Sequence, residues 1–161
     1  MNPPLQEALN LPPHDQLGFV LSDIDAAITI YEPLFGPFKR MDPGPFDYTF
    51  RGAHEPAELK LAFGRSGDIE IELIEWVSGA TPHKEFLDAG REGMHHLRFI
   101  VEDLDAKIAE AKPFGYDAIW HAEFGPDLAV AYLERDADPL VIEFFQNGGL
   151  TAFQSRQQSS A

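Results

Sequence analysis

Two stretches of this chain repeat each other at a constant spacing. Residues 16–28 read QLGFVLSDIDAAI, and residues 96–108 read HLRFIVEDLDAKI. The identical positions are Leu17 and Leu97, Phe19 and Phe99, Asp23 and Asp103, Asp25 and Asp105, Ala26 and Ala106, and Ile28 and Ile108. Chance rarely gives so many matches in so short a window, and repeated sequence indicates repeated structural units. We therefore expect two copies of one module.

Each copy predicts the same order of elements. A short alternating strand leads into an Asp-x-Asp sequence, whose acidic side chains favour the start of a helix. Pro33 and Pro113 are expected to help end these helices, and three strands follow in each copy. The expected elements are strand 16–21, helix 24–34 and strands 46–51, 58–64 and 69–76 in the first copy, and strand 96–101, helix 104–112 and strands 117–121, 128–134 and 140–146 in the second.

The expected fold class is α+β, with two βαβββ modules forming one curved mixed sheet around a metal-binding cavity. The linker between the modules, 77–92, contains one predicted short helix at 83–89. Both ends of the chain are expected to be loose or to pack against a partner subunit in a homodimer. The expected boundaries are an N-terminal extension at 1–13, one domain at 14–146 with modules 14–78 and 92–146, and a flexible C-terminal tail at 147–161.

Alternation along the strands separates two faces of the predicted sheet. Four strands (16–21, 69–74, 96–101 and 140–145) have one wholly apolar face, which suits packing under a helix. Modules joined edge to edge would turn the opposite, polar faces toward a common cavity. One amide oxygen, one imidazole and two carboxylates would meet there, which suits a divalent cation and leaves positions open for water or substrate. The predicted metal ligands are Gln16, Glu72, His96 and Glu143.

Two further charged residues share this inner face, Glu70 and Arg98. A guanidinium offers a forked pair of donors, so Arg98 either binds a carboxylate or phosphate of the substrate or pairs with an inward glutamate such as Glu70. The sequence leaves both roles open. The parity of His95 places it on the opposite side from His96, as a structural or surface histidine. The remaining histidines lie in or near predicted turns and strand ends and are expected to be solvated: His14, His54, His83 and His121.

Composition excludes several classes of function. The chain has 12 Lys and Arg against 27 Asp and Glu, a formal net charge of -15, which repels nucleic acid and anionic membrane surfaces. No apolar run reaches the roughly 18 residues of a membrane helix. The absence of cysteine excludes disulfides and thiolate metal sites, and it fits a cytoplasmic protein.

One stretch of the chain resembles a known family. Residues 71–76 read IELIEW, residues 83–87 read HKEFL, and residues 90–106 read GREGMHHLRFIVEDLDA. Together they resemble the vicinal oxygen chelate superfamily, which includes glyoxalase I, methylmalonyl-CoA epimerase, extradiol dioxygenases and bleomycin-resistance proteins. The Glu-Gly-x-His-His spacing is closest to methylmalonyl-CoA epimerase. The resemblance covers residues 14–146.

The resemblance assigns the family's metal ligands to the same four positions that alternation selects. Epimerases usually have histidine where this chain has Gln16, whereas glutamine with two glutamates and one histidine is similar to glyoxalase I. The implied cofactor is a divalent ion such as Zn, Ni, Co or Mn. Arg98 stands where the family usually has a small residue.

The function implied by the resemblance is that of a metal-dependent isomerase, epimerase or lyase. Such an enzyme removes a proton next to a carbonyl and stabilises the enediolate on the metal. Glu143 is the predicted base, Glu72 the second choice and Glu70 the third. The expected substrate is a small carbonyl compound, possibly a thioester, for which Arg98 is the candidate binding residue. The alternative is a non-catalytic binding or resistance protein of the same fold.

Overall fold

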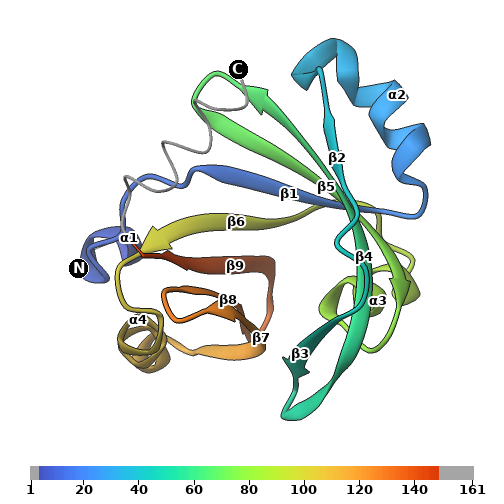
Figure 1. Ribbon diagram of the computed structural model, residues 1–161. Helices are drawn as coiled ribbons and strands as arrows, with labels where there is room; N and C mark the ends of the chain where they lie inside the picture. Colours follow the sequence, from blue (N-terminus) through green and yellow to red (C-terminus); the bar gives the residue numbers. More distant parts are fainter. Residues whose placement is uncertain (1–3, 149–161) are drawn as a thin grey trace.

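The computed structural model of the protein describes residues 4–148 (Figure 1). The chain folds into one mixed sheet with helices on its outside. Its helices are α1 Leu5–Ala8, α2 Ile24–Phe35, α3 Pro82–Asp88 and α4 Leu104–Ala111, followed by the 3-10 turn η1 Lys112–Phe114. Its strands are β1 Gln16–Leu21, β2 Lys39–Met41, β3 Phe46–Phe50, β4 Ala53–Ser66, β5 Ile69–Ser78, β6 Gly93–Val101, β7 Tyr116–Gly125, β8 Leu128–Arg135 and β9 Asp138–Asn147.

The nine strands follow the order β2-β4-β3-β7-β8-β9-β6-β1-β5, and β4 also pairs with β5. The sheet therefore closes on itself, with β2 outside the ring, and Figure 1 shows it curling around an interior. The seam between β3 and β7 is short, because only Thr49 and Phe50 pair there, with His121 and Trp120. The predicted curved mixed sheet is confirmed. Strand β2 was not predicted, because three residues are too few to show alternation.

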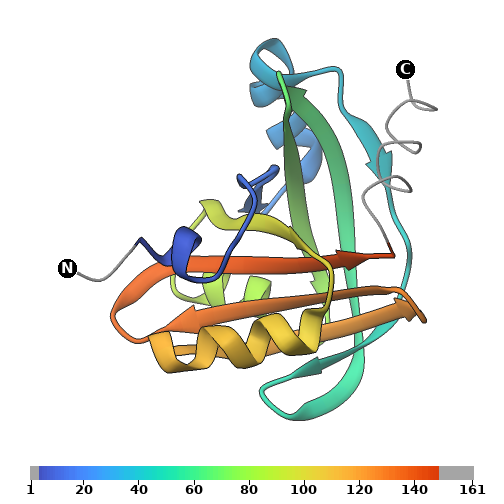
Figure 2. The same cartoon turned by 90° about the vertical axis from the view of Figure 1, so that its left-hand side faces the viewer.

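The two modules are joined through their first strands. β1 runs parallel to β5, β6 runs parallel to β9, and β1 pairs antiparallel with β6. The apolar faces of these strands lie under helices as alternation predicts: Ile71 and Leu73 pack with Ile24 of α2, while Ile142 and Phe144 pack with Leu104 of α4. Figure 2 shows α4 lying along the outer side of the β7–β9 strands.

Both main helices begin at the predicted aspartates. Asp23 and Asp103 each accept a hydrogen bond from the backbone N–H three residues later, at 2.9 Å. Helix α2 ends at Phe35, two residues after Pro33 and one residue beyond the expected end at residue 34. Proline cannot donate to the carbonyl four residues back and its ring crowds that carbonyl, so a helix is expected to end soon after it. None of the helices within residues 4–148 is long and apolar enough to cross a membrane.

The segment before β1 packs on the second module. Leu9, which follows α1, is 2% exposed and belongs to the apolar cluster that includes Leu104 and Phe144. Lys107 of α4 donates a hydrogen bond to the carbonyl oxygen of Leu9 at 2.8 Å. The second half of the expected extension therefore contributes to the core of this chain. Residues 1–3 and 149–161, and with them nearly all of the expected C-terminal tail, lie outside the described residues.

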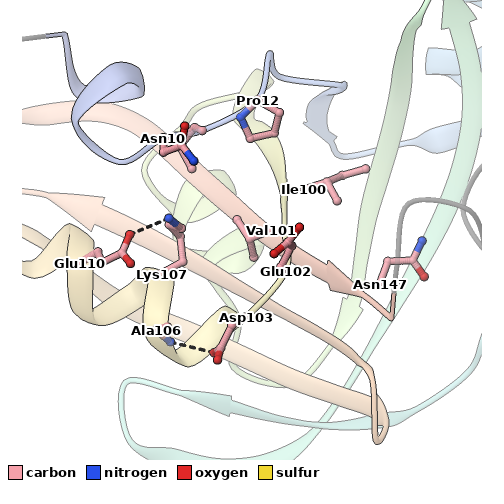
Figure 3. A pocket seen from close by; sticks show the side chains of 11 residues that line it. Asn10, Pro12, Ile100, Val101, Glu102, Asp103, Ala106, Lys107, Glu110 and Asn147 are labelled. Carbon is pink, nitrogen blue, oxygen red and sulfur yellow. Dashed lines mark hydrogen bonds and ion pairs between the residues drawn. The ribbon is translucent and has the colours of Figure 1, made fainter.

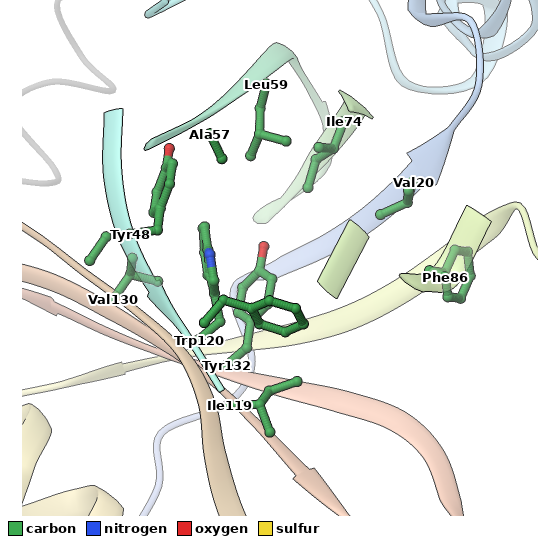
Figure 4. Packing of buried hydrophobic residues seen from close by; sticks show 12 residues of the cluster. Val20, Tyr48, Ala57, Leu59, Ile74, Phe86, Ile119, Trp120, Val130 and Tyr132 are labelled. Carbon is green, nitrogen blue, oxygen red and sulfur yellow. The ribbon is translucent and has the colours of Figure 1, made fainter. Parts of the chain in front are cut away.

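The inner face of the ring carries a separate apolar cluster, rich in aromatic side chains (Figure 4). Trp120 packs between Tyr48 and Tyr132, with ring centroids 4.6 and 4.5 Å apart. Val20 and Ile74 reach the same cluster from β1 and β5. The predicted metal ligands lie on these same inner faces, so the polar site adjoins an apolar interior.

Candidate metal centre

The register of four adjacent strands brings the polar inner residues into two rows. In the first row Gln16 pairs with Glu70 on one side and with Arg98 on the other, and Arg98 pairs with Glu143. In the second row Gly18 lies between Glu72 and His96. All four predicted ligands therefore belong to one chain and meet where its two modules join.

Gly18 leaves the space in which the second row converges. A Cβ atom at this position would lie 2.0 Å from Cε1 of His96, so the imidazole covers the glycine backbone. The ring reaches across Gly18 toward Glu72 for this reason. The role of Gly18 was missed at the sequence level, although its place between two predicted ligands on the same face was a usable signal.

The side chains of three ligands form one cluster. Glu72, His96 and Glu143 each offer a ligand atom, and these atoms lie within 4.8 Å of one another. From Nε2 of His96 the distances are 2.8 Å to Oε2 of Glu143 and 3.5 Å to Oε2 of Glu72. Gln16 joins them, because its Oε1 lies 3.3 Å from the same nitrogen. Three oxygens from three strands thus surround one imidazole nitrogen.

The donor set fits a divalent cation. Oε2 of Glu143 is buried, and the positive group beside it is the imidazole of His96, whose Nε2 lies 2.8 Å away. One imidazole serves two glutamates here, so a neutral His96 leaves both carboxylates in need of another source of positive charge. Among the described residues, the ion pairs around the cluster join four carboxylates, from Asp15, Glu70, Glu72 and Glu143, to one guanidinium and one imidazole. A cation bound by nitrogen and oxygen lone pairs would compensate this excess of negative charge.

The negative charge of these carboxylates also changes the pKa of His96. Burial lowers the pKa of this imidazole, but the negative charges of Glu143 and Glu72 outweigh burial and raise it to about 9. In the metal-free protein a proton on His96 thus partly neutralises the two glutamates. Because a metal binds only the neutral ring, metal binding must release that proton.

Arg98 is held by carboxylates of its own chain. Its Nε and terminal nitrogen donate to the two carboxylate oxygens of Asp15 at 2.9 and 2.8 Å, and the terminal nitrogen lies 3.3 Å from Oε1 of Glu70. The guanidinium also lies over the ring of Phe145. This arrangement matches the charge-partner role, and a substrate-binding role for Arg98 stays a prediction. Asp15 was missed as its main partner, because it precedes the strand whose alternation was used.

The sequence-level placement of two histidines is wrong. His83, expected to be solvated, is 0% exposed, and its Nε2 lies 3.1 Å from the hydroxyl of Tyr132. His95, expected on the opposite side from His96, lies beside it, with 3.2 Å between the two Nδ1 atoms. The cause is an irregularity in the β1–β6 pairing, where His96 pairs with Gly18 but Phe19 pairs with Met94. A bulge of this kind breaks strict alternation.

Burial lowers the pKa of His83 to about 3, and that of His95 is also lowered well below its usual value, so both rings are neutral near pH 7.

A surface pocket of about 740 Å³ lies elsewhere, between the segment after α1, the end of β6 and the first turns of α4 (Figure 3). Its walls include Asn10, Lys107 and Asn147. It shares no lining residue with the glutamate–histidine cluster, so it is separate from the predicted metal site.

Comparison with known proteins shows the family to which the fold belongs. Residues 15–132 match the model of the Glyoxalase/Bleomycin resistance protein/Dioxygenase superfamily. The chain belongs to this superfamily. The chain is 24% identical to the uncharacterized protein YqjC of Bacillus subtilis (strain 168) over 94 residues. That match covers 58% of this chain and 61% of YqjC.

Solved structures share the superfamily fold. The hypothetical protein BH1468 from Bacillus halodurans C-125 is 25% identical, with a TM-score of 0.58 over 83% of this chain and 93% of that one. Methylmalonyl-CoA epimerase from Mycobacterium tuberculosis is 19% identical, with a TM-score of 0.60 over 89% of this chain and 93% of that one. The Streptomyces coelicolor epimerase in complex with 2-nitronate-propionyl-CoA is also 19% identical, with a TM-score of 0.61 over 86% and 99%. At this identity the epimerases support the fold alone.

Gly18→Ala is expected to damage the centre, because the new methyl group must displace the His96 ring. Overpacking of this kind costs about 1–3 kcal/mol of unfolding free energy. We also expect weaker zinc binding, measured by competition with a chelator. The control is the same substitution in a His96→Ala background, where the space is already vacated and the stability cost should disappear. Equal costs in the two backgrounds would contradict this geometry.

Proposed function

We propose that this superfamily member is a metal-dependent isomerase, epimerase or lyase that removes a proton next to a carbonyl. The observation that carries the proposal is the convergence of Glu72, His96 and Glu143, in which two largely buried glutamates share one imidazole. A cluster that binds a cation needs oxygen and nitrogen lone pairs that converge in this way.

The four inner residues would bind the metal, and one of them would also transfer the proton. Gln16, Glu72, His96 and Glu143 would hold a divalent ion such as Zn, Ni, Co or Mn. The ion supplies Lewis acidity, which withdraws negative charge from the oxygens of a bound carbonyl compound. The carboxylate of Glu143 would accept the proton from the α-carbon, and Glu72 is the second choice. The aromatic cluster around Tyr132 would exclude water from this exchange, since its ring lies 4.8 Å from that of His96.

A small carbonyl compound is the proposed substrate class, in preference to a CoA thioester. A CoA phosphate group would need basic side chains at the entrance, and the candidates are Lys39, Arg40, Lys84 and Arg91. Arg40 pairs with Asp25 and Asp42, and Lys84 pairs with Asp88. Arg91 lies over the ring of Phe86. These engagements and the net charge of -15 favour a substrate without phosphates. The proposal includes a cytoplasmic homodimer with no nucleic-acid or membrane partner.

The second candidate is a non-catalytic binding or resistance protein. The inner cluster of Tyr48, Trp120 and Tyr132 favours it, because an interior rich in aromatic side chains suits the sequestration of an apolar ligand. A binder of this type needs no proton transfer. Catalysed exchange of an α-proton therefore separates the two candidates.

Metal content is the first test of the proposal. Protein purified without chelator and then supplied with zinc, nickel, cobalt or manganese should retain about one divalent ion per chain, measured by elemental analysis after desalting. His96→Ala is the matched control and should retain far less. A wild-type content near zero for all four metals would overturn the enzyme proposal.

A further inference from the structure

The orientation of the Gln16 side chain decides whether it can bind a cation. Its carboxamide has an oxygen and an NH2 group of nearly equal size, and only the oxygen has lone pairs for a metal. In the structure Oε1 lies 3.3 Å from Nε2 of His96, so the oxygen is on the side of the cluster. A half-turn of the amide would bring the NH2 group to the same place.

The ligand cluster by itself favours the wrong orientation in the metal-free protein. Carboxylates accept hydrogen bonds, and those of Glu72 and Glu143 would attract an NH2 group turned toward them. Gln16 is 1% exposed, so water cannot compensate either end of the amide. Something outside the cluster must therefore hold the NH2 group away from it.

Glu70, on the neighbouring strand, holds the NH2 group of Gln16 away from the ligand cluster. Its Oε1 accepts a hydrogen bond from Nε2 of Gln16 at 2.7 Å. An ionised carboxylate has no proton to donate, so a turned amide would place two acceptor oxygens against each other. Only one orientation of Gln16 satisfies Glu70, and it is the one that presents Oε1 to the cluster.

Glu70 is itself fixed. The terminal nitrogen of Arg98 lies 3.3 Å from the same Oε1, and this nitrogen and Nε also donate hydrogen bonds to the two carboxylate oxygens of Asp15. Arg98 is 5% exposed and cannot turn away to solvent. The sequence of contacts Asp15–Arg98–Glu70–Gln16 therefore ends at a predicted metal ligand.

We infer that Glu70 is a positioning residue that makes Gln16 an oxygen ligand, with Arg98 and Asp15 holding it in place. This inference rests on the metal site of the proposed function. It gives Glu70 a task other than that of a base. Partners that orient metal ligands from outside the coordination sphere commonly change metal affinity by about 10- to 100-fold.

A double-mutant cycle on metal affinity tests the inference. Glu70→Gln keeps the volume but can offer either an oxygen or an NH2 group, so it no longer selects one orientation of Gln16. We expect Glu70→Gln to weaken zinc binding by about 10-fold or more, measured by competition with a chelator. In a Gln16→Ala background the same substitution should change zinc affinity little, because the side chain it orients is gone.

The controls separate orientation from charge and from folding. Glu75→Gln removes one negative charge from the same strand, but Glu75 lies on the outer side, where it pairs with Lys60. Its zinc affinity should equal that of the wild type. The absorption spectrum of the cobalt-loaded protein should change in Glu70→Gln and stay unchanged in Glu75→Gln, whereas thermal unfolding of the metal-free variants reports folding alone.

Two results would overturn the inference and leave the proposed function standing. One is a Glu70→Gln variant with wild-type zinc affinity. The other is an equal loss of affinity in the wild-type and Gln16→Ala backgrounds, which would show that Glu70 acts by its charge. Wild-type protein that binds none of the metals would instead overturn the proposed function together with this inference.

Discussion

Glu143→Gln is expected to lower the rate of α-proton exchange by about 100-fold or more, the usual scale for loss of a general base. Glutamine keeps the volume and a coordinating oxygen but cannot accept and release the proton. The side chain lies at the meeting point of the two modules, and its Oε2 lies 2.8 Å from Nε2 of His96. The measurement is deuterium incorporation from heavy water into a panel of α-substituted carbonyl compounds, with metal content determined on the same samples.

Glu72→Gln is the matched comparison for this experiment. Both glutamates belong to the same cluster, so both variants should lose some metal affinity, but only loss of the base should stop exchange in metal-loaded protein. Metal-loaded Glu143→Gln that exchanges at the wild-type rate would reduce Glu143 to a ligand and move the proton transfer to Glu72 or Glu70. Wild-type protein that exchanges no proton of any compound would favour the binding protein.

Arg98→Leu is expected to lower the free energy of unfolding by about 3–5 kcal/mol, the usual cost of removing one partner from a buried ion pair. The guanidinium is 5% exposed and serves Asp15 and Glu70 together, so leucine would leave two carboxylates without their cation. Chemical denaturation of the metal-free protein measures this cost without interference from a bound ion.

Arg40→Leu provides the control for Arg98→Leu. Arg40 also pairs with two carboxylates, Asp25 and Asp42, but those partners are largely exposed, and pairs of this kind contribute at most about 1 kcal/mol. Arg98→Leu could instead lower the unfolding free energy no more than Arg40→Leu and yet sharply weaken the binding of a carbonyl substrate. In that case Arg98 would bind the substrate and would not be the charge partner.

The sequence by itself determined the modules and the inner faces. The repeat places two βαβββ units in the chain, and side chains alternate along any regular strand whatever its neighbours are. These local rules were enough to select Gln16, Glu72, His96 and Glu143, which the structure brings together. The aspartates at the helix starts were predictable for the same reason, since capping depends on residues within one turn.

Only the tertiary structure decided which inner side chains touch. The bulge that moves His95 beside His96 arises in the pairing of two strands from different modules, and no alternation within β6 reveals it. The contact of Arg98 with Asp15, the burial of His83 and the space that Gly18 leaves for His96 also depend on register between distant segments. Register is set by the packing of the whole sheet, because each strand can be shifted along its neighbour without any change in its own sequence pattern.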